Sequence, residues 1–219
     1  MARAITETAK AAKANHILEK AYELYEKGTF KSIKMIDIAN ASGVSKGTMF
    51  NYFSTKEKLF LEILKREYQV RFENLISSFK KQNVLDFEGF KNIILNEMES
   101  ILLEDSVLMR LTAIMHNILE ENLDYETALS FKLDFHNFMM TIANIIVERV
   151  DCITLDDCKN LFMTQHALIV GYRNMSNVPD VVKQVLEDHD LNDFKIDFKQ
   201  NVLKAMELYL DGLYLEKTK

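Results

Sequence analysis

The scarcity of turn-forming residues is the feature that most restricts the fold of this chain. It has one proline and only six glycines in 219 residues. Folds rich in strands need many tight turns, and tight turns favour these two residue types. Leu, Ile, Met, Glu, Lys and Ala, which are good or acceptable helix residues, supply much of the rest. The sequence therefore predicts an all-α fold, and its 48% of hydrophobic residues can form a substantial core.

Helix signals divide the first 80 residues into three short segments and one long one. Apolar residues at helical spacing predict a first helix that ends at Gly28, because glycine takes the left-handed conformation found after helices without strain. A second short helix ends before Gly43, and Ser45 is placed to cap a third. Residues 54–57 form a Ser-x-x-Glu capping box, which predicts a fourth helix that continues to about Phe79.

The remaining residues show amphipathic helical patterns separated by short breaks. The predicted spans are 86–103, 106–121, 124–150, 154–176, 180–188 and 194–215. No internal repeat or flexible linker interrupts them, and the fourth helix is expected to continue from a small N-terminal part into a larger body. We therefore expect two domains in chain order, a head of residues 1–55 and a body of residues 56–219.

Charge is distributed unevenly along the chain. The formal net charge is −6, but residues 1–60 contain ten Lys and Arg against six Asp and Glu, a net charge of +4. The remainder therefore has 17 basic and 27 acidic residues, a net charge of −10. A basic head on an acidic body is the pattern expected when only the head contacts phosphate.

Several features favour a cytoplasmic protein with no membrane partner and no cofactor. No apolar run approaches the ~20 residues needed to span a bilayer, and the N-terminus lacks the apolar core of a secretory signal. Cys152 and Cys158 are the only cysteines, so we expect neither a disulfide framework nor a zinc site.

Common catalytic motifs are not found in the sequence. The five histidines are too far apart for a zinc-binding H-E-x-x-H helix, and no G-x-S-x-G nucleophile motif occurs. The segment 43–48 does not have the spacing of a phosphate-binding P-loop. The sequence therefore indicates that the protein is not an enzyme.

The second and third predicted helices, with a tight turn at Gly43, form a helix-turn-helix. A small residue is expected where the two backbones approach, and Gly43 meets that need. Residues 45–48 and Asn51 are small or polar, as suits a helix that enters the major groove. The apolar residues of the third helix are expected to face inward wholly or in part: Met49, Phe50 and Phe53.

These segments resemble the DNA-binding part of the TetR family of bacterial transcriptional regulators. The resemblance is carried by Asp37-Ile38-Ala39, by Gly43-Val44-Ser45-Lys46-Gly47-Thr48-Met49-Phe50-Asn51-Tyr52-Phe53 and by Lys56-Glu57-Lys58-Leu59, and it spans about residues 10–70. It implies a three-helix, helix-turn-helix head joined by a long helix to a larger, helical ligand-binding and dimerisation domain.

The resemblance also implies which residues contact DNA. Asn51 is expected to read a base, because an amide can form two hydrogen bonds with an adenine edge. Lys46 is expected to reach guanine or phosphate, and Tyr52 to donate its hydroxyl to the DNA backbone. The full predicted set is Lys34, Ser45, Lys46, Gly47, Thr48, Asn51, Tyr52 and Lys56, the last on phosphate.

Two positions depart from the family pattern. Phe50 stands where the family usually has a tyrosine whose hydroxyl bonds phosphate, so Phe50 is expected to pack instead. Ile33 and Lys34 stand where a Thr or Ser usually caps the second helix. The cap is therefore expected to be lost or to move to Ser32, while Lys34 keeps a charge for phosphate.

The predicted helices 154–176 and 194–215 have broad apolar faces. These faces either complete the core of one copy or, as the resemblance implies, pair with a second copy in a four-helix bundle. A two-fold homodimer suits the reading of a palindromic operator in double-stranded DNA, because one short head contacts few base pairs.

The middle of the body is rich in Met, Phe and His, which either form core or line a cavity for a small, largely apolar effector. The candidate lining residues are Met98, Met109, Met115, His116, Phe135, His136, Met139, Tyr172 and Arg173. The chain is thus interpreted as a ligand-responsive regulator, with repression as the commoner behaviour of the family. The alternative is a helical adaptor or ligand-binding protein whose head does not bind DNA.

Overall fold

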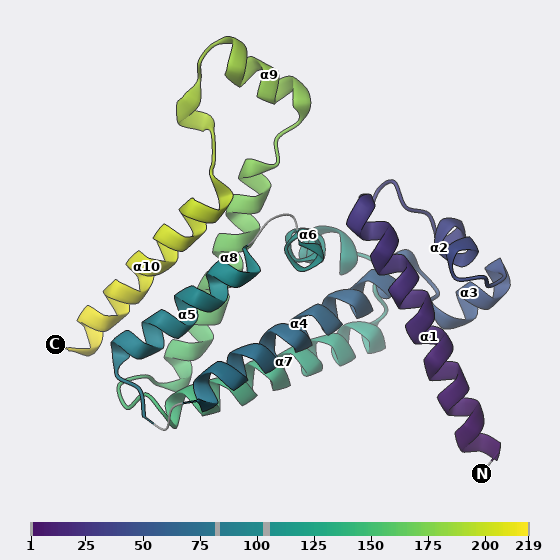
Figure 1. Ribbon diagram of the computed structural model, residues 1–219, viewed down its shortest axis with the longest axis horizontal. Coiled ribbons are helices and arrows are strands. Elements are labelled where there is room, and N and C mark those ends of the chain that lie inside the picture. Colours follow the sequence, from purple (N-terminus) through teal and green to yellow (C-terminus); the bar gives the residue numbers. More distant parts are fainter. Residues whose placement is uncertain (1, 82–83, 103–105, 219) are drawn as a thin grey trace. The chain divides into compact units, whose positions relative to one another are not determined.

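The computed structural model describes residues 2–81, 84–102 and 106–218, and all regular structure in these ranges is helical (Figure 1). The N-terminal helices are α1 (Ala2–Lys27), α2 (Met35–Ala41), α3 (Lys46–Tyr52) and α4 (Lys56–Lys80). They are followed by α5 (Phe87–Ile101), α6 (Val107–Ile114), the π-helical turn η1 (Met115–Leu119) and α7 (Tyr125–Val147). The last elements are α8 (Leu155–Ser176), α9 (Asp180–Asp188), the 3-10 turn η2 (Asn192–Phe194) and α10 (Phe198–Lys217). The all-α prediction is confirmed.

The helices group into two compact units that interleave in sequence. The first unit contains the described residues up to Tyr68 together with Ile114–Lys132. The second contains Gln69–Ala113 and the described residues from Leu133 onward. Helices α4 and α7 each contribute to both units, so neither unit is one continuous segment of chain.

The first unit is built around aromatic side chains from α1, from α4 and from the segment between α1 and α2. The ring of Phe60 lies 5.0 Å from that of Tyr25 and 5.3 Å from that of Phe30, measured between centroids. Lys58 of α4 forms an ion pair with Asp124, whose carboxylate also accepts a 3.0 Å hydrogen bond from the N–H of Thr127 in the first turn of α7. This pair fastens the start of α7 to the start of α4.

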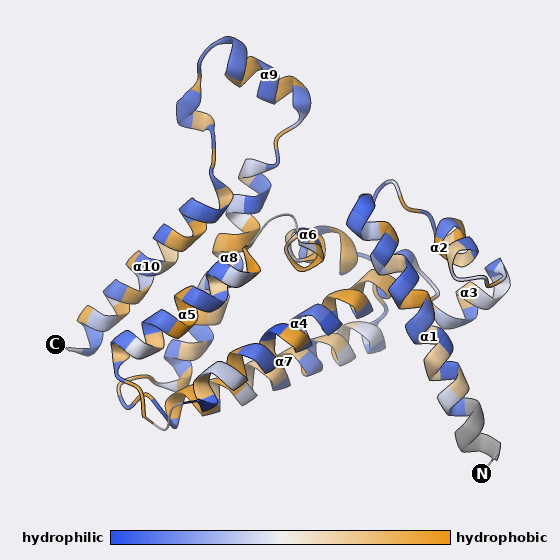
Figure 2. Ribbon diagram, viewed as in Figure 1, coloured by the Kyte–Doolittle hydropathy of each residue, from blue (hydrophilic) through white to orange (hydrophobic). Residues whose placement is uncertain are grey.

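The second unit has α10 packed against both α5 and α8. Figure 2 shows hydrophobic residues recurring along these helices between hydrophilic ones, as expected for amphipathic elements. Inside, the Arg71 guanidinium donates to Glu97 at 2.6 Å and to Gln165 at 2.7 Å, which joins α4, α5 and α8. Both charged side chains of this pair are buried, so each is an ion that depends on the other for compensation.

The predicted end of α1 is correct in place, but its cause is different. The helix ends at Lys27, yet Gly28 does not take a left-handed conformation. A Cβ on Gly28 would lie 3.2 Å from the Leu24 carbonyl oxygen and 3.2 Å from the Ser32 hydroxyl. Glycine therefore provides room for this turn rather than an unusual backbone angle.

The predicted start of α4 is also correct within a residue, but the cap is not Ser54. The N–H of Lys58 donates to the Thr55 hydroxyl at 3.2 Å. Since Lys56 begins the helix, Thr55 occupies the N-cap position.

Candidate nucleic-acid interface

The turn between α2 and α3 depends on one glycine. Gly43 has φ of 64°, in the left-handed region that disfavours other residues, and its N–H donates to the Asn40 carbonyl at 3.2 Å. A Cβ at Gly43 would meet no atom within 4 Å. The predicted reason, close approach of two backbones, is therefore wrong, and the glycine is required by the backbone angle alone.

The first turn of α3 is capped by Ser45, as predicted. Its hydroxyl accepts a 3.1 Å hydrogen bond from the N–H of Thr48 and lies 2.9 Å from the Thr48 hydroxyl. The cap holds one of the free N–H groups at this helix end and leaves others open to an anion.

Two apolar side chains anchor α3 to the rest of the unit. Met49 is fully buried and Phe53 is nearly so. Ile38 of α2 is fully buried too. These anchors fix which face of α3 is presented outward, as the sequence predicts.

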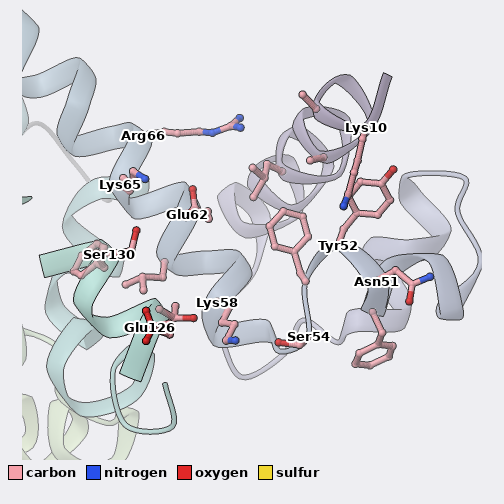
Figure 3. Close-up of a pocket in the computed structure, with 18 of the residues that line it drawn as sticks. Lys10, Asn51, Tyr52, Ser54, Lys58, Glu62, Lys65, Arg66, Glu126 and Ser130 are labelled. Atoms are coloured by element: carbon pink, nitrogen blue, oxygen red, sulfur yellow. The ribbon is translucent and has the colours of Figure 1, made fainter. Parts of the chain in front are cut away.

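The outward face of α3 consists of four residues at positions i, i+1, i+4 and i+5. They are Lys46, Gly47, Phe50 and Asn51, all exposed, and Figure 3 shows Asn51 pointing outward, away from Lys58 and Glu62. Thr48 and Tyr52 are half-buried at its edges.

The position of Phe50 differs from the prediction. Its side chain is 42% exposed instead of packing inward. The spacing of four residues from Lys46 already places it on the outward face, so this residue could have been identified from the sequence.

The start of α2 is organised by Asp37 rather than by Ser32. The Asp37 carboxylate accepts a 2.9 Å hydrogen bond from the N–H of Lys34, and the Ser32 hydroxyl is engaged with Thr29 instead. Of the two predicted alternatives, loss of the cap is therefore confirmed, because Lys34 makes no capping hydrogen bond with its side chain, and transfer of the cap to Ser32 is wrong. The Lys34 side chain remains exposed.

Lys56 has a structural role that the sequence does not reveal. Its ammonium donates to the carbonyls of Phe30 at 2.6 Å and Ile33 at 3.0 Å, and it lies 4.1 Å from the centre of the Phe30 ring. Partial burial lowers its pKa from the ordinary lysine value. Two of the three N–H groups of the ammonium are used in this way, which leaves one for a phosphate oxygen.

A groove of about 870 Å³ lies beside this face within the first unit. It is lined by residues of α1, by the end of α3, by α4 and by the start of α7. Lys10 of α1 and Tyr52 of α3 both line it, and Figure 3 labels both. Both basic and acidic side chains line it: Lys10, Lys58, Lys65 and Arg66, and Glu7, Glu62 and Glu126.

Comparison with known protein families decides what this arrangement is. Residues 17–63 match the model described as "Bacterial regulatory proteins, tetR family". Residues 65–217, more than half of the chain, match "Tetracyclin repressor-like, C-terminal domain". The chain belongs to the TetR family. Members of this family are DNA-binding transcriptional regulators and not enzymes.

The fold is shared with a solved bacterial regulator, and a second solved structure shows a weaker likeness. The fatty acid degradation regulator FadR from Bacillus halodurans is 16% identical, with a TM-score of 0.57 over 90% of this chain and 94% of that chain. NalD, the secondary repressor of the MexAB-OprM multidrug efflux pump in Pseudomonas aeruginosa, is 21% identical, with a TM-score of 0.45 over 91% and 95% of the two chains. A search of curated proteins gives no significant match.

The residues predicted to line an effector pocket in this TetR protein are divided between the two units. Met115 and His116 belong to the first unit, and the other seven belong to the second. Met98 and Met109 are fully buried, whereas His116 and His136 are exposed. Phe135 contacts Phe72, with 5.8 Å between ring centroids, and Arg173 stacks on Phe198.

Among the residues that the structure places, no group of three or more His, Cys, Asp and Glu side chains could hold a metal ion. In that part of the chain, too, no helix combines the length and apolar character needed to cross a membrane.

Proposed function

We propose that this TetR family member is a ligand-responsive repressor that binds a palindromic operator as a homodimer. A small, largely apolar molecule releases it. The observation that best supports this proposal is the outward face of α3, which presents Lys46, Gly47 and Asn51. Buried apolar side chains hold this short helix in place. An exposed polar face on an anchored short helix suits insertion into the major groove.

The residues of this interface divide between base reading and phosphate binding. Asn51 reads an adenine edge, and Lys46 reaches guanine or phosphate. The free N–H groups around Ser45 and Gly47 approach the sugar-phosphate backbone. Thr48 hydrogen-bonds with the capping Ser45 and lies at the edge of the DNA major groove. Tyr52, Lys34 and Lys56 bind the DNA backbone.

Phe50 adds an apolar element to the reading of sequence. A large apolar side chain on the outward face of α3 has no polar group to offer a phosphate, but it can pack against the methyl group of thymine. We infer that Phe50 favours thymine at one position of each half-site, next to the base that Asn51 reads.

The homodimer forms through α8 and α10. The apolar residues that complete the core of one copy, such as Leu161 and Met206, are already buried. Other apolar side chains on the same helices remain more than half exposed: Met163, Met175, Leu208 and Leu215. An apolar surface of this kind on paired helices is typical of a subunit interface, and a two-fold interface matches a palindrome.

The effector acts on the body, residues 56–219, and reaches the head, residues 1–55, through α4. A ligand that prefers one arrangement of the dimer shifts the population toward it, by no more than its difference in affinity for the two arrangements. Release requires that the preferred arrangement places the two heads at a spacing that does not fit the operator.

The test starts from DNA fragments that the protein retains from its own genome, followed by fluorescence titration at several salt concentrations. Salt-sensitive binding to a palindrome is the expected result. If an intact dimer shows no such binding to any retained fragment, the protein is instead a helical adaptor with an inactive head. Loss of binding upon addition of candidate apolar effectors tests the repressor mechanism.

A further inference from the structure

A closed polar network lies inside the second unit, where α4, α5 and α8 meet. The Nε group of Arg71 donates to one carboxylate oxygen of Glu97 at 2.6 Å, and Nη2 donates to the other at 3.3 Å. Nη2 also donates to the side-chain carbonyl of Gln165 at 2.7 Å, and the Gln165 amide donates to Glu97 at 3.3 Å. The side chains of Arg71 and Glu97 are each 8% exposed, and Gln165 is 4% exposed. All three groups are thus shielded from water.

Stability alone does not account for such a network. Taking two charges out of water costs free energy that their attraction recovers only in part, and well-packed apolar side chains of similar size are often as stable or more stable. Phe72 and Met98, next to Arg71 and Glu97 in sequence, are buried, so α4 and α5 already contribute apolar side chains to the core. The network therefore calls for an explanation in its geometry.

The geometry of the network selects one arrangement of the three helices. A guanidinium is planar and presents its N–H groups in a fixed fork, which matches both oxygens of a carboxylate at once. Apolar contacts are non-directional and set no such condition. A slide of α4 by about 1.5 Å, the rise of one helical residue, would misalign the bonds of Arg71 to Glu97 and to Gln165 together.

Arg71 lies where α4 enters the second unit. This helix belongs to the first unit up to Tyr68 and to the second from Gln69 onward. Gln165 belongs to α8, one of the two helices of the proposed homodimer interface. We propose that the network of Arg71, Glu97 and Gln165 holds α4 in one register against α5 and α8 and thereby sets the spacing of the two heads. The inference rests on the homodimer proposed above.

Small changes of register are sufficient to affect operator binding. Arg71 is 15 residues from Lys56, the first residue of the same helix, which is about 22 Å at 1.5 Å per residue. A tilt of α4 by about 10° at Arg71 displaces the start of the helix by about 4 Å, which exceeds the rise of about 3.4 Å between base pairs. The three side chains are therefore positioning residues, which act on DNA binding through α4.

The first experiment replaces the whole network by apolar side chains in the triple variant R71M/E97L/Q165L. The variant should unfold at a temperature no lower than the native chain. Fluorescence titration then compares the operator recovered from retained genomic fragments, a single half-site, and the operator with one base pair inserted between its half-sites. Half-site affinity should stay within twofold, while the preference for the native spacing over the inserted one should fall at least fivefold.

A surface ion pair provides the matched control. Glu99 and Lys199 form an exposed pair at 3.0 Å that joins α5 to α10 and does not involve α4. The variant E99M/K199M should keep the preference for the native spacing within twofold. An unchanged preference in a folded, dimeric triple variant overturns the inference. Equal losses of affinity for the half-site and the operator also overturn it, because the network would then maintain the head itself.

Arg71→Lys keeps the test decisive if the triple variant does not fold. An ammonium keeps the buried positive charge but lacks the planar fork. This variant should lower the preference for the native spacing at least threefold with half-site affinity retained. Circular dichroism and sedimentation velocity establish that it is helical and dimeric. An unchanged preference in this variant overturns the inference.

The native chain separates this inference from the proposed function. Native protein that binds no palindrome, or that binds both spacings equally well, removes the paired heads and the role of the network together. A native preference for one spacing that persists in R71M/E97L/Q165L and in Arg71→Lys removes the role of the network alone.

Discussion

At the scale of single residues, Phe50 gives the sharpest test of sequence reading. Operators in which deoxyuridine replaces each thymidine lack only the thymine methyl group. At the contacted position, this replacement and Phe50→Ala should each cost about 1 kcal/mol of binding free energy. The two changes made together should cost little more than either change alone, because both remove the same contact. A fluorescence titration of the four combinations measures this coupling.

Asn51→Ala is the control for the Phe50 measurement. It should cost about 1–3 kcal/mol at one adenine and add independently to the loss from deoxyuridine. If the losses of binding free energy from Phe50→Ala and from deoxyuridine add fully at every thymidine position, Phe50 does not read the methyl group.

Two lysines at the edge of the interface should behave differently. Lys34 is exposed, so Lys34→Ala should weaken DNA binding to all sequences and leave thermal stability unchanged. The slope of the logarithm of the DNA-binding constant against the logarithm of the salt concentration should fall in magnitude by about 1. Lys56→Ala should have the same effect on the slope. It also removes two hydrogen bonds to backbone carbonyls and should cost about 1–3 kcal/mol of stability.

Thermal unfolding of both lysine variants, beside salt titrations of DNA binding, checks these expectations. Equal melting temperatures for the two variants would contradict the structural role of Lys56.

At the scale of helices, the start of α8 is tied to the end of α10 by one carboxylate. Asp157 accepts hydrogen bonds from the N–H of Thr154 at 2.8 Å and from the ammonium of Lys217 at 2.6 Å. Partial burial acts to raise the pKa of Asp157, but the hydrogen bonds from Lys217 and Thr154 outweigh it and hold the pKa below its ordinary value of 3.8.

Asp157→Asn should therefore lower the free energy of unfolding by about 1–2 kcal/mol at pH 7. Folding lowers the pKa of Asp157. The contribution of Asp157 to the free energy of unfolding is therefore complete above the ordinary carboxyl pKa, and it is lost as the pH falls through the lower pKa of the folded state. Urea unfolding at pH 7 and near pH 3 should show a smaller difference between Asp157→Asn and the native chain at the lower pH. Asp156→Asn, at an exposed neighbour, is the matched control and should have little effect at either pH.

Helices and anchors could be predicted because they depend on neighbours in sequence. The cap at Ser45 and the burial of Met49 follow from local spacing, and the structure confirms both. The hydrogen bonds of Lys56 cross 23 and 26 residues, and the bond from Arg71 to Gln165 crosses 94. Such contacts depend on how helices pack, which periodicity does not encode.

The interleaving of the two units has the same origin. The sequence indicates a continuous fourth helix, and α4 does run unbroken from Lys56 to Lys80. It gives no sign that Ile114–Lys132 groups with the N-terminal helices, because the ion pair between Lys58 and Asp124 joins residues far apart in the chain.

At the scale of the whole molecule, the proposed homodimer makes binding sensitive to the spacing of the operator. Two heads that bind one DNA molecule together gain about 10²–10⁴ in affinity over a single head, provided that both half-sites can be reached. Each head continues into its body through α4, which is one helix from Lys56 to Lys80.

An insertion of five base pairs between the half-sites turns one of them to the opposite side of the duplex, since B-DNA repeats about every 10.5 base pairs. The operator affinity should then fall by about 100-fold or more, to the level of a single half-site, when measured by titration. The same insertion placed outside the palindrome should have no effect. If the five-base-pair insertion is tolerated, the heads are not held at a fixed spacing, and release by an effector cannot operate through a change in that spacing.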